Sequence, residues 1–299
     1  MREVLWRPAE ADIERARVTA FRREVNERHG LALADWTSLR RWSVEQPARF
    51  WESVWHFCGV RGSRPWDEVL VDGDLMPGAR WFAGARLNFA ENLLRRGGGR
   101  DAIVFRGEGG ARRRWSHDEL LNLVARLARA LRAEGVGPGD RVAGFLPNLP
   151  EAVAAMLAAA SIGAVWSSCS PDFGIGGVLD RFGQIAPKVL FTADGYVYGG
   201  KRHDSLARVR GILDRLPSVR RTVVVPYVSD APDLSGARGA VLFGEFDGKE
   251  PAAPPEFEPL PFDHPLFILY SSGTTGLPKC MVHSAGGTLL QHLKEHRLH

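Results

Sequence analysis

The chain has 299 residues, of which 44% are hydrophobic and 25% are charged, a composition typical of a globular protein with one large domain or two. Lysine and arginine together number 39 against 35 acidic residues, so the net charge is only +4. The basic cluster Arg112-Arg113-Arg114 lacks the interleaved aromatic residues of a nucleic-acid surface. We therefore predict a solvated surface there and no nucleic-acid partner.

No segment is typical of a membrane or secreted protein. Residues 1–18 are polar and lack the apolar core of a signal peptide. The longest apolar run, Ala152–Trp166, is shorter than the roughly 20 residues that span a bilayer. The cysteines Cys58, Cys169 and Cys280 are too far apart for a metal knuckle, and their odd number fits a reducing compartment. We predict a cytoplasmic protein with no membrane partner and no metal bound by its own side chains.

Residues 1–70 are predicted to form a helical N-terminal region that precedes a larger domain over residues 71–299. Apolar residues recur at helical spacing in Ala9–His29, which predicts one helix. Aromatic residues share one face of Pro47–Cys58, which indicates a second helix packed into a core.

From Ala102 onwards, predicted strands and helices alternate with short turns between them. This alternation is typical of an α/β fold with a parallel sheet covered by helices. The spacing of Ser116 and Glu119 predicts a capping box at a helix start. Ser229–Pro261 is rich in Pro, Gly and Asp and is predicted to be irregular. Strands are predicted over Ala102–Arg106, Arg141–Leu146, Ala164–Ser168, Val189–Thr192 and Thr222–Pro226, and helices over 116–134, Pro150–Ser161, Gly177–Ala186 and Ser205–Leu216.

The most informative segment is a loop that follows the apolar run Pro265–Tyr270. Every residue from Ser271 to Gly276 is Ser, Thr or Gly, and Lys279 follows closely. Glycines allow the backbone to approach a ligand, successive amides form a concave anion site, and hydroxyls donate to phosphate oxygens. A lysine adds a positive charge suited to a polyphosphate. The segment therefore predicts a loop that binds the phosphates of a nucleotide.

This loop is not the G-x-x-x-x-G-K-[ST] loop of kinases and GTPases, because Gly276 is followed by Leu-Pro-Lys. Ser-Ser-Gly-Thr-Thr-Gly-Leu-Pro-Lys resembles the signature of the adenylate-forming superfamily of acyl-CoA synthetases, luciferases and peptide-synthetase adenylation domains. Most superfamily members have Gly after the lysine, whereas this chain has Cys280. We interpret Cys280 as a small buried thiol rather than a nucleophile.

The resemblance becomes narrower when longer segments are compared. The run from Ser271 to His296, with its Lys279-Cys280-Met-Val-His-Ser-Ala-Gly-Gly core, is similar to the acetoacetyl-CoA synthetase family. The segments Leu39–Pro47, Trp81–Leu94 and Ser167–Gly174 resemble the same family. The resemblance covers nearly the whole chain and implies an α/β fold of layered parallel sheets with helices, the N-terminal domain of an adenylate-forming enzyme, here truncated.

The resemblance also implies a two-step acid–thiol ligase reaction in ketone body and lipid metabolism. Acetoacetate would attack the α-phosphate of ATP and expel pyrophosphate, and the thiol of coenzyme A would then attack the acyl carbon of the acyl-adenylate and expel AMP. Mg²⁺ would bridge the phosphates. By position, Thr275 and Lys279 are the predicted catalytic residues. The predicted ATP phosphate-binding residues are Ser271, Ser272, Gly273, Thr274, Thr275, Gly276 and Lys279.

Lys201 and Arg202 lie where related short-chain enzymes place basic residues near the 3′-phosphate of coenzyme A; a solvated basic turn is an equal alternative. Members of the family continue well beyond the loop, and the residues that surround the acyl group lie mostly there. The 299-residue chain alone is therefore expected to be inactive. Two alternatives stay open, a ligase for acetate or propionate and a non-catalytic nucleotide-binding remnant. The sequence carries no signal for an oligomeric state.

Overall fold

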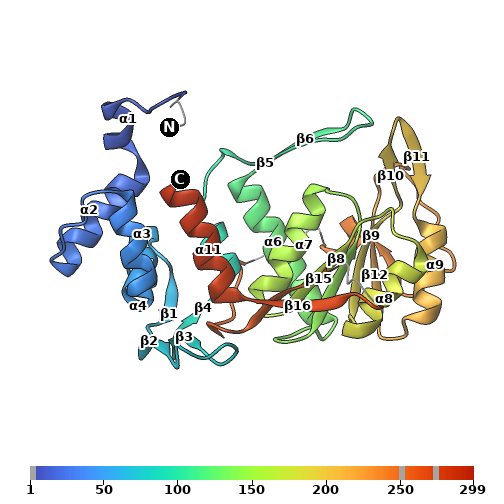
Figure 1. Cartoon of the computed structure of the whole chain (residues 1–299). Coiled ribbons are helices and arrows are strands. Elements are labelled where there is room, and N and C mark those ends of the chain that lie inside the picture. The colour runs from blue at the N-terminus through green and yellow to red at the C-terminus, as the bar shows by residue number, and fades with distance from the viewer. Residues whose placement is uncertain (1–4, 249–252, 272–275) are drawn as a thin grey trace. The chain divides into compact units, whose positions relative to one another are not determined.

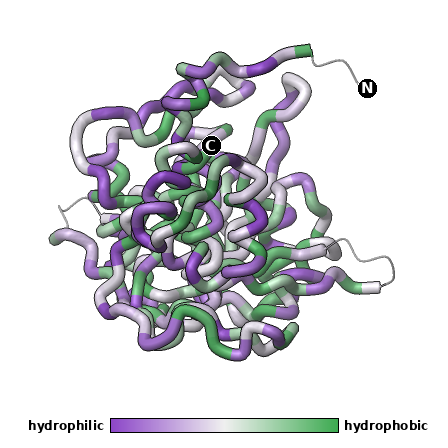
Figure 2. The backbone as a smooth tube through the Cα atoms, turned by 60° about the vertical axis from the view of Figure 1, so that its left-hand side comes forward, coloured by the Kyte–Doolittle hydropathy of each residue, from purple (hydrophilic) through white to green (hydrophobic). Residues whose placement is uncertain are grey.

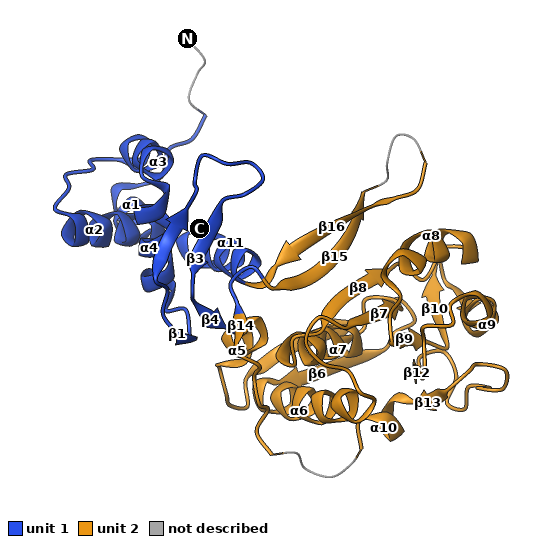
Figure 3. Ribbon diagram, turned by 90° about the horizontal axis from the view of Figure 1, so that it is seen from below, with its two compact units in different colours: residues 1–87, 261–263, 286–299 blue, residues 88–260, 264–285 orange. Residues whose placement is uncertain are grey.

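A computed structural model describes residues 5–248, 253–271 and 276–299. The chain divides into two compact units (Figure 3). Unit 1 contains residues 1–87, 261–263 and 286–299, and unit 2 contains residues 88–260 and 264–285. The domain division at residue 70 stays a proposal about the whole protein. Along the helices, hydrophilic and hydrophobic residues alternate, as expected for amphipathic helices with one buried face (Figure 2).

Unit 1 is mainly helical. The single helix predicted over residues 9–29 is two helices, because Ala16 has extended backbone dihedrals between them. The first buries no residue, whereas the second buries Phe21 and Val25, so only the second is fixed by core packing. The helices are α1 (Glu10–Arg15), α2 (Arg17–His29), α3 (Trp36–Glu45), α4 (Pro47–Cys58) and most of α11 (Ala285–Leu298), and the strands are β1 (Gly62–Arg64), β2 (Glu68–Val71), β3 (Arg80–Ala83) and β4 (Arg86–Leu87).

The core of unit 1 is aromatic. Trp55 of α4 stacks on Phe82 with ring centroids 5.0 Å apart, and Phe21 of α2 makes edge contacts with Phe50 and Phe57 of α4. Aromatic pairs in such geometries contribute beyond the area that they bury. The aromatic face predicted for Pro47–Cys58 is therefore confirmed as a core face.

Unit 2 contains a seven-stranded sheet with the order β13-β12-β9-β7-β8-β15-β16. Its strands β8, β9, β12, β15 and β16 are labelled in Figure 1. All neighbouring strands are parallel except β15 and β16, which form an antiparallel pair. The predicted parallel sheet is confirmed. Its strands are β7 (Arg141–Phe145), β8 (Val165–Cys169), β9 (Val189–Ala193), β12 (Arg221–Val225), β13 (Ala240–Leu242), β15 (Pro265–Ser271) and β16 (Lys279–Ser284).

Four helices pack on this sheet as two pairs, with α6 beside α7 and α8 beside α9 (Figure 3). Phe182 of α8 and Ile212 of α9 are fully buried in one core cluster with Phe145 of β7 and Leu190 of β9. The predicted capping box is confirmed, since the Ser116 hydroxyl accepts from the Glu119 amide at the start of α6. The helices are α6 (His117–Ala133), α7 (Pro150–Ser161), α8 (Ile175–Ile185) and α9 (Leu206–Arg215), with the short α5 (Phe89–Leu94) and α10 (Phe243–Phe246).

Two segments of unit 2 are among those that differ from the sequence predictions. The Ser229–Pro261 region, predicted to be irregular, contains β13, which pairs with β12, and the short helix α10. Helix α8 begins at Ile175, directly after Gly174, instead of at Gly177. Two hairpins, β5–β6 and β10–β11, extend from the sheet. Their strands are β5 (Asp101–Arg106), β6 (Arg112–Ser116), β10 (Gly195–Tyr198) and β11 (Lys201–Asp204); β14 covers Leu260–Pro261.

Within the described part of the chain, every helix is too short or too polar to cross a bilayer.

Candidate active site

The candidate site lies at one edge of the unit 2 sheet. Because β9, β7, β8 and β15 are parallel neighbours, their carboxyl ends meet at the same edge. The predicted phosphate loop follows β15, and the β10–β11 hairpin follows β9. Open α/β sheets bind ligands in the crevice outside the carboxyl ends of their strands. The topology therefore brings the two sequence-predicted binding segments to the edge where a ligand is expected.

The two arms of the predicted phosphate loop meet as neighbouring strands. Ser271 ends β15 and is the direct cross-strand partner of Lys279, which begins β16. Gly276 has φ +96°, a left-handed conformation that favours glycine, and no atom lies within 4 Å of where its Cβ would be. The structure thus brings Ser271 and Lys279 together at the loop end of the β15–β16 hairpin. The predicted residues Ser272, Gly273, Thr274 and Thr275 lie outside the described residues.

Lys279 presents an unpaired positive charge at this end of the hairpin. Its side chain is exposed, and no carboxylate of the described ranges lies within ion-pair distance of its ammonium. By contrast, Lys188 pairs with Asp140 at 2.6 Å, and Lys294 pairs with Glu295 at 2.7 Å. An ammonium without a protein partner can contact an anionic ligand without first losing an ion pair.

The strand that leads into the loop is fixed by a buried hydroxyl pair. The Ser167 hydroxyl on β8 is hydrogen-bonded to the Tyr270 hydroxyl at 3.0 Å and to the Ile268 carbonyl at 2.8 Å. Burial raises the pKa of Tyr270 to about 12, against the opposing effect of the hydrogen bond from Ser167. The sequence contained Ser167 within a family-like segment but gave no signal of its contact with Tyr270.

A cavity of about 760 Å³ opens beside the same edge. It is lined by residues of β8 and β10, by residues that follow β7 and β8, and by one face of α7. Its size lies within the range of small-molecule sites, and its wall mixes apolar and polar groups, as such sites do. Representative lining residues are Met156, Trp166, Ser168, Ser170, Asp172 and Tyr198.

Lys201 and Arg202 occupy successive positions of β11 and therefore point to opposite faces of the hairpin. Lys201 pairs across the hairpin with Tyr198, a residue that lines the 760 Å³ cavity. Arg202 lines a second cavity of about 470 Å³, and its guanidinium donates to the Val228 carbonyl at 3.2 Å. The structure therefore does not bring the two predicted coenzyme A ligands to one face.

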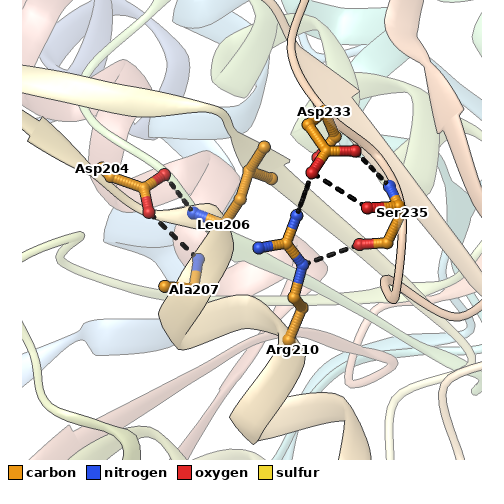
Figure 4. Close-up of polar contacts among 6 residues, drawn as sticks. All are labelled: Asp204, Leu206, Ala207, Arg210, Asp233 and Ser235. Atoms are coloured by element: carbon orange, nitrogen blue, oxygen red, sulfur yellow. Dashed lines mark hydrogen bonds and ion pairs between the residues drawn. The ribbon is translucent and has the colours of Figure 1, made fainter.

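The second cavity is bordered by polar groups that form hydrogen bonds and an ion pair within the protein (Figure 4). The Arg210 guanidinium donates to the Asp233 carboxylate at 3.1 Å and to the Ser235 carbonyl at 2.7 Å. The Ser235 hydroxyl and amide donate to Asp233 and hold the pKa of that carboxyl below its usual value, with help from Arg210. The Asp204 carboxylate accepts from the amides that begin α9. We interpret this network as structural.

The three cysteines differ in exposure, and the interpretation of Cys280 as a buried thiol is wrong. Cys280 is exposed, and it lies on β16, the last strand of the described sheet, in which every residue but the last is exposed. Cys58 and Cys169 are buried, and burial raises the pKa of the Cys169 thiol to about 12.

We expect iodoacetamide to alkylate Cys280 of the folded protein first, because only a thiolate within reach of the reagent reacts. Peptide mass spectrometry over a time course measures the order of labelling, and a sample unfolded in urea provides the control in which all three cysteines react. Labelling of Cys169 before Cys280 in the folded protein would contradict the structure.

Comparisons with known proteins agree with this geometry. A family model described as AMP-binding enzyme matches residues 89–297, and a model described as acetyl-coenzyme A synthetase N-terminus matches residues 36–93. The chain is 54% identical over 296 residues to an acetoacetyl-coenzyme A synthetase of Rhizobium meliloti (strain 1021) and 48% identical over 305 residues to an acetoacetyl-CoA synthetase of Macaca fascicularis.

A solved structure, the acetoacetyl-CoA synthetase from Streptomyces lividans, superposes with a TM-score of 0.92 at 46% sequence identity. The alignments cover 99% of this chain but 45% of each of these three proteins, so the chain spans less than half of their length. Since the first family model covers most of the chain, including the loop and the sheet edge described above, the chain belongs to the family of AMP-binding enzymes.

Proposed function

We propose that the complete product of this gene is an AMP-forming acid–thiol ligase that converts acetoacetate, ATP and coenzyme A into acetoacetyl-CoA, AMP and diphosphate. The observation that carries the proposal is the unpaired Lys279 beside Ser271, at the mouth of a Ser/Thr/Gly loop, in a chain that is 54% identical to an acetoacetyl-coenzyme A synthetase. Because the chain spans about 45% of such relatives, the activity is assigned to the complete gene product.

The first chemical step would bring a carboxylate anion onto a polyanion, so the protein has to supply positive charge and alignment. Lys279 would neutralise charge on the β- and γ-phosphates, and Thr275 and the neighbouring hydroxyls and amides would donate to the phosphate oxygens. Ser271 and Gly276 lie at the two ends of this loop. Mg²⁺ would reach the site with ATP and supply positive charge beside the phosphates.

The second step would require coenzyme A near the same sheet edge. The 760 Å³ cavity beside β7 and β8 has room for part of such a ligand. Lys201, the cross-strand partner of the cavity residue Tyr198, would contact a phosphate group of coenzyme A. Arg202, which lines the other cavity, is the weaker candidate. The protein is proposed to act in the cytoplasm on small molecules.

Product analysis tests this proposal. We expect the complete gene product, given ATP, Mg²⁺, coenzyme A and acetoacetate, to form acetoacetyl-CoA together with AMP, as detected by mass spectrometry and nucleotide chromatography. The 299-residue chain alone is expected to form neither product. Faster turnover of acetate than of acetoacetate would favour the alternative of a ligase for acetate or propionate. Formation of ADP, or no product with either acid, would overturn the proposal.

A further inference from the structure

Helix α8 contacts both arms of the hairpin that carries the phosphate loop. From the contacts described below, we propose that Gln184 and Arg181 of α8 are positioning residues that hold Lys279 and the base of the loop in place for the nucleotide. This inference rests on the proposed function, because it assigns these side chains a role in binding ATP.

Gln184 is bonded to the residues on both sides of Lys279. Its amide nitrogen donates to the Pro278 carbonyl at 2.9 Å, and its amide oxygen accepts from the Cys280 thiol at 3.6 Å. The same nitrogen also donates to the Asp180 carbonyl one turn earlier in α8. One side chain therefore connects the helix to the backbone before Lys279 and to the side chain after it. A glycine at position 280 could not make the second of these bonds.

Arg181 contacts the opposite arm of the hairpin. Its guanidinium lies 5.8 Å from the centroid of the Tyr270 ring and 4.6 Å from that of Phe173, and it donates to the Gly177 carbonyl at 2.8 Å. A cation in this position is attracted to the face of the ring. No acidic side chain in the described ranges forms an ion pair with Arg181.

These two contacts meet at a single cross-strand pair. Tyr270 of β15 lies opposite Cys280 of β16, directly next to the pair formed by Ser271 and Lys279. Arg181 and Gln184 are three residues apart and so lie on the same face of α8. The helix therefore contacts the hairpin at the last pair before the one that begins the loop.

Such contacts matter because β16 is otherwise weakly held. Within the described sheet it is an edge strand paired only with β15, and all but its last residue are exposed. Helix α8 is by contrast fixed in the core, where Val178 and Phe182 are fully buried. Tying the edge strand to a rigid helix restricts the orientations of Lys279, so less conformational entropy is lost when a phosphate binds.

The test compares Gln184→Met, which keeps the length of the side chain but removes both hydrogen bonds, with wild type. Gln184→Glu keeps an acceptor for the Cys280 thiol, loses the nitrogen that donates to the Pro278 and Asp180 carbonyls, and adds a negative charge near Lys279. Gln291→Met is the matched control, because Gln291 is an exposed helical glutamine bonded only to Glu295 of its own helix. All variants are made in the complete gene product, and KM values for ATP, acetoacetate and coenzyme A are measured together with the melting temperature.

We expect Gln184→Met to raise the KM for ATP about fivefold, the equivalent of one hydrogen bond, and to leave the KM for acetoacetate and the melting temperature unchanged. Hydrogen exchange in residues 279–284 should become faster even without nucleotide. Gln291→Met should change neither the KM for ATP nor the rate of hydrogen exchange in residues 279–284. Gln184→Glu should raise the KM for ATP at least as much as Gln184→Met, because its carboxylate repels the Pro278 carbonyl and the phosphates of ATP.

Two results would overturn the inference: an unchanged KM for ATP in Gln184→Met, or an equal rise in KM for all three substrates together with a lower melting temperature. In either case, activity of the wild-type protein would leave the proposed function standing. A wild-type protein that does not use ATP would overturn both this inference and the proposed function. Unchanged hydrogen exchange in residues 279–284 would show that Gln184 does not hold the strand, whatever the activity.

Discussion

Replacing Lys279 with alanine in the complete gene product is expected to lower the rate of acyl-adenylate formation by about 100-fold, the typical effect of removing one preorganised group that stabilises transition-state charge. Lys279 is exposed at the start of β16 beside Ser271, and its ammonium has no acidic partner among the described residues. Its loss would therefore remove charge from the site without breaking an internal ion pair. The rate is measured as acetoacetate-dependent exchange of pyrophosphate into ATP.

Lys294→Ala is the matched control for Lys279→Ala. Lys294 lies on α11 and pairs with Glu295, so its removal should cost only a surface ion pair and leave the exchange rate unchanged. Lys279→Arg keeps the charge but changes the geometry of the donors, and we expect it to recover part of the activity. A Lys279→Ala variant with more than half of the wild-type exchange rate would contradict the role given to this lysine.

Replacing Asn88 with alanine is expected to lower the free energy of unfolding by about 3 kcal/mol, because it leaves several buried groups without hydrogen bonds. Asn88 is 1% exposed and precedes α5. Its amide nitrogen lies 3.0–3.2 Å from the carbonyl oxygens of Ala160, Ser161 and Glu258, and its oxygen accepts from the amides of Ala90 and Glu91. The side chain thus caps one helix and connects three segments of unit 2.

Urea unfolding followed by circular dichroism measures this loss. Asn122→Ala is the control, because Asn122 is an exposed residue of α6, and alanine has the higher helix propensity there. Its stability should equal that of wild type or exceed it slightly. A loss below about 1 kcal/mol for Asn88→Ala would mean that water or neighbouring groups replace the bonds seen in the structure.

The sequence predicted best those elements whose signals are local. Pro47–Cys58 and Pro150–Ser161 both begin with proline at the first helical position, and both have the predicted bounds. Strand β16 was missed because it forms by pairing with β15 in a hairpin. Most of its residues are exposed, so no alternation of apolar and polar residues marks it as a strand. Strand β13, only three half-buried residues long, depends on pairing with β12 and has no pattern of its own.

In the candidate site too, the sequence predicted features that depend on neighbouring residues and missed contacts between residues far apart in the chain. A contiguous motif indicated the loop, and the topology of the sheet agrees with its expected position after β15. The contact of Gln184 with Pro278 joins residues 94 positions apart, and only the folded chain brings them together. The opposite directions of Lys201 and Arg202 likewise depend on β11 being a strand, which the sequence reading did not predict.

We propose that this chain contributes a phosphate-binding loop to an enzyme that adenylates acetoacetate. The most direct test of this proposal is ATP–pyrophosphate exchange by the complete gene product without coenzyme A, with acetoacetate and acetate measured side by side. Exchange that depends on acetoacetate and is much slower with acetate is the result that we predict. Exchange that favours acetate would contradict the substrate assignment, and no exchange with either acid would contradict the proposal itself.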